Sequence, residues 1–186
     1  MSANEILEEV YQQYLSSIKI HQFAKNRTKH DTKFAIQIIS PRKTKKAQHK
    51  SHIIDDFFDD LKTDITESYI LNIITTFERI VFNKIDNAYG VIKKIITSEY
   101  QNRYNKKDSA PLHRSVISFI KNKEDFYSLS GARKVLENHI SEELLKDLKE
   151  IIEYRNYLSH GKRQNVGKAS TLKIDEIKDI LMNIIN

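Results

Sequence analysis

Apolar residues recur every three to four positions along most of this 186-residue chain, which is the spacing of amphipathic α-helices. The pattern predicts helices over residues 4–23, 64–100, 113–121, 128–139 and 141–161, and a last helix that starts at Ser170 or Thr171. Only 4 Gly and 2 Pro are present, so the turn residues that a β fold needs are scarce. We therefore predict an all-α bundle of five to seven helices, forming a single domain over residues 1–186.

The predicted helix over 141–161 ends in a cluster of reactive side chains. Ser141 is a good N-cap, and Gly161 suits the left-handed conformation that ends a helix. Arg155, Asn156 and His160 lie just before that end. At about 100° per residue, Asn156 and His160 are separated by about 40° around the helix, and Arg155 and His160 by about 140°. All three can face one cleft if the last turn loosens before Gly161.

The six residues from Arg155 to His160, RNYLSH, resemble the R-x4-6-H motif of the HEPN superfamily, including its preferred polar residue after the arginine. The helical pattern extends this resemblance over roughly residues 60–186. The resemblance implies an all-α, metal-independent ribonuclease of toxin–antitoxin, abortive-infection or phage-defence type. It also implies a homodimer whose active site combines Arg155, Asn156 and His160 of both chains, and RNA products with 2′,3′-cyclic phosphate and 5′-hydroxyl ends.

The residue types in this motif fit RNA cleavage without a metal. That reaction needs a group to take the 2′-OH proton, a group to protonate the leaving 5′-oxygen, and a cation for the phosphorane charge. His160 and Arg155 supply these types, and the alternative is a helix-capping histidine beside a solvated arginine. Arg133–His139 and Arg42–His49 have similar spacings, but neither combines Arg-Asn with a long apolar-striped helix and a terminal Gly.

Glu78 stands inside the most apolar part of the predicted 64–100 helix, beside Arg79. A charged residue in so apolar a stretch needs a partner or a cleft. HEPN relatives often carry an acidic residue on this helix, so the resemblance implies that Glu78 supports Arg155 or His160. The alternative is a salt bridge that faces outward.

Residues 25–52 are rich in Lys and Arg, and we interpret them as a basic loop or insertion. This stretch is either a solvated loop or an RNA-backbone contact through side chains such as Lys43, Lys45 and Lys46. Its apolar patch, Phe34 to Ile39, fits a short strand or a buried helical turn. Lys162 and Arg163, directly after the motif, are further candidates for RNA binding.

Five aspartates between Asp55 and Asp64 are candidates for a metal site, although acids that open a helix are commoner. The chain has no Cys, no H-E-x-x-H pattern and no glycine-rich phosphate loop, so we expect neither a metal nor a cofactor. The absence of Cys fits a cytoplasmic protein, and no apolar run reaches the length of a membrane span. A net charge of +6 favours a polyanionic partner.

Two functions follow for the whole chain. The first is a metal-independent endoribonuclease that acts on RNA as a homodimer. The second is a non-catalytic HEPN-type module that binds RNA or a protein partner such as an antitoxin. A third interpretation, a helical structural subunit with no role on nucleic acid, predicts associations that salt does not affect.

Overall fold

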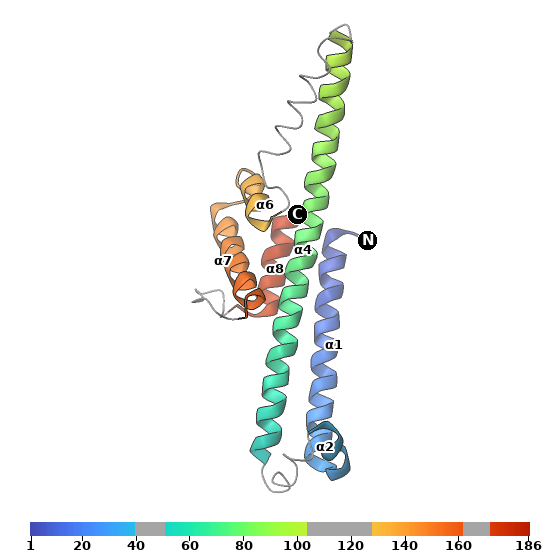
Figure 1. The fold of residues 1–186 in the computed structure, drawn as a ribbon, viewed down its shortest axis with the longest axis vertical. Helices are drawn as coiled ribbons and strands as arrows, with labels where there is room; N and C mark the ends of the chain where they lie inside the picture. The colour runs from blue at the N-terminus through green and yellow to red at the C-terminus, as the bar shows by residue number, and fades with distance from the viewer. Residues whose placement is uncertain (40–50, 104–127, 162–171) are drawn as a thin grey trace. The chain divides into compact units, whose positions relative to one another are not determined.

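The computed structural model describes residues 1–39, 51–103, 128–161 and 172–186, and this part of the chain is helical with no β-strand (Figure 1). Its helices are α1 (Ala3–His30), α2 (Thr32–Ile38), α4 (Ser51–Arg103), α6 (Leu129–Leu136), α7 (Glu142–Ser159) and α8 (Ile174–Ile185). The predicted all-α class is confirmed. The helix predicted over 113–121, and the cap predicted at Ser170 or Thr171, lie outside the described residues.

Helix α1 begins with a capping box and ends seven residues later than predicted. The Ser2 side chain accepts a hydrogen bond from the Glu5 backbone, and the Glu5 carboxylate accepts one from the Ser2 backbone. Residues 25–52 were predicted as a basic loop or insertion, and the loop interpretation is wrong for 25–30, 32–38 and 51–52, because α1 continues to His30, α2 follows at once and α4 begins at Ser51. Asp31 caps both helices: its backbone N–H ends α1, and its side chain accepts from the Phe34 backbone. The apolar patch after it is therefore helical.

Helix α4 starts 13 residues before its predicted start and runs for 53 residues. The aspartates between Asp55 and Asp64 therefore lie within the helix instead of opening it. The helix continues through Gly90 without a break. No helix in the described ranges is both long enough and apolar enough to cross a membrane.

The chain divides into two compact units. Unit 1 comprises Met1–Ile73 and Leu172–Asp179, and unit 2 comprises Ile74–Thr171 and Ile180–Asn186. Both units take part of α4 and part of α8. The prediction that residues 1–186 form one domain stays a prediction.

In unit 1, α1 and the first part of α4 run antiparallel. Residues 14–17 of α1 contact residues 66–69 of α4, whereas residues 21–29 contact residues 55–59. The start of α8 joins α1 through Lys178, whose Nζ lies 3.1 Å from the Glu8 carboxylate and 4.5 Å from the centre of the Tyr11 ring. Burial lowers the pKa of Lys178, but the hydrogen bond and charge of Glu8, with a smaller contribution from Asp179, outweigh it and raise the pKa overall.

Unit 2 buries apolar side chains from each of the helices described in it. The fully or nearly fully buried residues are Ile74, Phe77, Ile80 and Val81 of α4, Leu129 and Ala132 of α6, Leu148, Ile151, Ile152 and Tyr154 of α7, and Leu181, Ile184 and Ile185 of α8. The apolar stripe predicted along α4 continues to Ile92 and Ile95, but these two side chains are exposed. The stripe therefore contributes to the core only in its earlier part.

Candidate functional site

The end of α7 has the local structure that its sequence predicts. The Ser141 side chain accepts a hydrogen bond from the Leu144 backbone N–H at 3.3 Å, which caps the start of the helix. Gly161 has a φ of 68°, the left-handed conformation expected of a helix stop. His160 has already left helical geometry, with φ −94° and ψ 19°, while its backbone N–H still donates to the Asn156 carbonyl. The helical conformation of α7 therefore ends at His160, the last residue of the motif.

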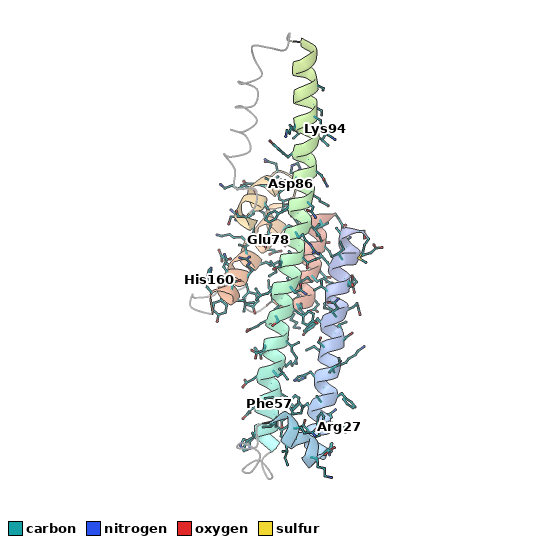
Figure 2. The ribbon with its side chains drawn as sticks, turned by 45° about the vertical axis from the view of Figure 1, so that its right-hand side comes forward. Arg27, Phe57, Glu78, Asp86, Lys94 and His160 are labelled. Atoms are coloured by element: carbon teal, nitrogen blue, oxygen red, sulfur yellow. The ribbon has the colours of Figure 1, made fainter. Side chains whose placement is uncertain are left out.

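Arg155 lies between two acceptors in unit 2. Its Nη2 is 3.6 Å from Oε2 of Glu78 on α4, and its Nη1 donates to Oδ1 of Asn156 at 3.3 Å. The Glu78 side chain is 16% exposed and that of Arg155 is 34% exposed. Figure 2 labels Glu78 on α4 and His160 at the end of α7. The structure therefore brings together Glu78, Arg155 and Asn156, which were all proposed from the sequence.

The contacts of Arg155 with Glu78 and Asn156 orient its guanidinium but contribute little to the stability of the fold. Partly exposed ion pairs typically contribute about 0–1 kcal/mol to folding. However, a guanidinium held on one side by Glu78 and on the other by Asn156 has fewer rotamers available than a free arginine. About a third of the Arg155 side chain remains accessible to a ligand. A cation that is held in place and partly exposed in this way is suited to bind an anionic group of a ligand.

The imidazole of His160 is exposed and stands apart from this array. Among the described residues its ring forms neither a hydrogen bond nor an ion pair. In the residue directly before it, the Ser159 hydroxyl donates to the Arg155 carbonyl at 2.8 Å, which satisfies a backbone acceptor at the helix end. The structure thus leaves the His160 ring free to contact a substrate but does not join it to Arg155.

The remaining motif candidates are only partly described. Lys43, Lys45, Lys46, Lys162 and Arg163 lie outside the described residues, as does the pair Arg42–His49. The other pair, Arg133 and His139, is described: Arg133 is on α6, and His139 is exposed in the turn after it.

Two tyrosines flank Arg155 and Asn156 in sequence. Tyr154 is 7% exposed, and its ring stacks on that of Tyr157 with centroids 6.3 Å apart. Their spacing of three residues places them on neighbouring positions of the helix surface, and this is the signal that predicts the contact.

Two of the aspartates near the start of α4, Asp55 and Asp59, belong to an ion-pair network in unit 1. Asp55 lies 2.7 Å from Lys29 and 3.0 Å from Lys25, and Asp59 lies 2.8 Å from Lys25. The hydrogen bonds from Lys29 and then Lys25 lower the pKa of Asp55 from 3.8 to about 2. In the described residues, no group of three or more acidic or histidine side chains is placed to hold a metal ion. Lys25 and Lys29 of the predicted loop thus pair with these two carboxylates.

Unit 2 also contains an apolar cavity of about 380 Å³, away from the motif residues. Val81, Ile85, Val135 and Ile184 are among the side chains that line it, and Lys84 Nζ at its edge donates to the Ile185 carbonyl. None of Glu78, Arg155, Asn156 or His160 lines this cavity.

Comparisons of the chain with protein families, with curated proteins and with solved structures found no match.

Proposed function

We propose that this protein is a metal-independent endoribonuclease of the HEPN type, acting as a toxin or phage-defence effector. The observation that carries the proposal is the array of Glu78, Arg155 and Asn156 placed one turn before an exposed His160 at the loosened end of α7. The resemblance of Arg155 to His160 to the R-x4-6-H motif supplies the reaction class.

In the proposed reaction, His160 takes the proton of a ribose 2′-OH, and the 2′-oxygen attacks the neighbouring phosphorus. The guanidinium of Arg155 stabilises the extra negative charge of the phosphorane. The bond to the 5′-oxygen then breaks, and this oxygen receives a proton. Because one histidine cannot serve both oxygens from opposite sides, the proton comes from the same histidine of a second copy in a homodimer. The products are a 2′,3′-cyclic phosphate and a 5′-hydroxyl.

Glu78 is the positioning residue in this proposal. Its carboxylate lies 3.6 Å from the guanidinium of Arg155 and points that group toward one side of α7. Glu78→Gln keeps the shape and removes the charge, so cleavage should fall while the helical content remains. Since the pair is partly exposed, the stability of the variant should change by no more than about 1 kcal/mol.

The test is cleavage of total cellular RNA in EDTA by the parent, His160→Ala and His139→Ala. His139 is a matched control, because it is an exposed histidine that follows an arginine at a similar spacing. We expect His160→Ala to cleave at least about 100-fold more slowly, and His139→Ala to cleave like the parent. End-group analysis should find cyclic phosphate and 5′-hydroxyl. Equal cleavage by parent and His160→Ala would exclude this mechanism.

A second function is favoured by one observation, the lack of a contact between the His160 ring and Arg155 in the described residues. On this alternative the chain is a non-catalytic module that binds RNA or an antitoxin-like protein. It then binds RNA without turnover, binding is insensitive to His160→Ala, and neutralising Lys43, Lys45 and Lys46 weakens it. A folded parent that binds RNA but leaves it intact would support this function.

A further inference from the structure

Two large apolar side chains are exposed on the outer face of α1 in unit 1. Ile20 is 69% exposed and Phe23 is 65% exposed, far more than the residues of the same helix that face α4 or α8. They are three residues apart, so they are neighbours on the helix surface, with Cβ atoms about 5–6 Å apart. Leaving both in water is unfavourable, by roughly 25 cal/mol for each Å² of apolar surface.

The charged residues of α1 within one turn of Phe23 are all positive. Lys19 lies one turn before it and Arg27 one turn after it, and both are exposed. Helix α1 has no acidic residue after Glu9. Whereas Lys25 and Lys29 are paired with Asp55 and Asp59, Lys19 forms no ion pair with any described residue.

Arg27 is already partly ordered beside this face. Its guanidinium carbon lies 4.8 Å from the centre of the Phe34 ring, and its Nε lies 3.8 Å from Asp31. The side chain is still 52% exposed. Figure 2 labels Arg27 near the end of α1. An ordered, accessible guanidinium loses less entropy when it contacts a phosphate.

We propose that Phe23 and Ile20 form a stacking surface for single-stranded RNA, whose phosphates are contacted by Lys19 and Arg27. A nucleotide combines the flat apolar face of its base with a negatively charged phosphate, and these match an exposed aromatic ring between two cations. A stable protein interface buries about 800 Å² on each partner, which two exposed apolar side chains cannot supply. This surface belongs to unit 1, while Arg155 and His160 belong to unit 2. RNA is the ligand in this proposal and in the proposed nuclease, but binding at Phe23 does not require that the RNA be cleaved.

The test uses the absence of Trp from the chain, because Phe23→Trp introduces a single indole. The probe is a 2′-O-methyl oligouridine 12-mer, which cannot be cleaved by attack of a 2′-OH. We expect the oligonucleotide to quench the indole emission of Phe23→Trp as the bases stack. The Kd should rise about 5-fold or more for both Phe23→Ala and Phe23→Leu, since neither has a π-face. Ile92→Ala, which truncates an exposed apolar side chain on α4, is the matched control and should bind like the parent.

Other results would overturn the proposal in distinct ways. Unquenched emission, or unchanged binding by Phe23→Ala, would exclude stacking at this position. Loss of binding in Phe23→Ala but not in Phe23→Leu would indicate general apolar contact, as a protein partner would make. No binding by the parent would exclude RNA from this face. Because the probe is resistant to cleavage, the His160→Ala assay on cellular RNA reports on the proposed nuclease separately.

Discussion

Both units of this protein bury apolar side chains, Leu7, Phe58 and Ile73 among them in unit 1, but the two units differ in the polar contacts that accompany this packing. In unit 1, α1 and α4 meet through hydroxyls, an imidazole and ion pairs, including Ser17 with Tyr69 at 3.0 Å and Lys25 with Asp59 at 2.8 Å. His21 is buried, and its Nε2 donates to the Phe58 carbonyl at 2.6 Å. In unit 2, the buried residues are apolar apart from Thr76, among the residues described.

This difference suggests that one kind of contact fixes how two helices align and another kind stabilises the folded state. Apolar packing is non-directional, so it stabilises a helix pair without fixing strongly how far one helix slides along the other. Hydrogen bonds have narrow geometry, and a buried polar group left without a partner costs about 1–3 kcal/mol. We infer that the polar contacts fix the antiparallel alignment of α1 on α4, while the apolar core supplies most of the stability of unit 2.

The largest expected effect comes from the core of unit 2. Phe77 is 0% exposed, so Phe77→Ala removes a buried ring and leaves a cavity. We expect this change to lower the free energy of unfolding by about 3–5 kcal/mol in urea titrations followed by circular dichroism. Ile95→Ala on the same helix is the control: Ile95 is 56% exposed, and its truncation should cost less than about 0.5 kcal/mol. Similar losses in both variants would contradict the assignment of Phe77 to the core.

A smaller effect is expected at the polar interface of unit 1. Ser17→Ala and Tyr69→Phe should each destabilise by about 1 kcal/mol, and the double variant by little more, because the two hydroxyls bond to each other. Tyr14→Phe provides the control. The Tyr14 hydroxyl is 3.5 Å from that of Thr66, at the limit of a hydrogen bond, so its removal should cost under about 0.5 kcal/mol. Additive losses in the double-mutant cycle would show that Ser17 and Tyr69 are not coupled.

The smallest effect is expected at the exposed ion pairs, where it depends on pH. The folded pKa of Asp55, about 2, is below its ordinary value of 3.8, so the folded state favours the carboxylate. The stabilisation is present above about pH 4 and is lost as the pH falls toward 2. Asp55→Asn should therefore unfold more easily than the parent at pH 6, and the difference should disappear near pH 2. Repeating the pH 6 measurement in 1 M salt should reduce the difference, because exposed charges are screened. A difference that does not depend on pH would show that charge is not its cause.

The sequence predicted the local features of the molecule well, because they depend on residues close together in the chain. The all-α class, the Ser141 cap and the left-handed Gly161 are local properties, and the structure confirms them. The motif residues Arg155, Asn156 and His160 were likewise found in six consecutive positions. Their catalytic role stays a prediction.

The end of the first helix could not be predicted from the local sequence, because it depends on contacts with another helix. The sequence pattern predicted that the first helix ends at residue 23, because the excess of Lys and Arg in residues 25–52 suggested a loop. The carboxylates that neutralise Lys25 and Lys29 lie about 30 residues later, on another helix, so no local pattern contains them.

The same limit explains the two ends of the apolar stripe on α4. Phe77 and Ile95 occupy equivalent positions in the pattern, yet one is buried and the other exposed. Periodicity determines which face of a helix is apolar, but burial depends on which other helices lie against that face. For the same reason the sequence proposed Glu78 as a partner of Arg155 only through a resemblance, whereas the tertiary structure placed their charged groups 3.6 Å apart.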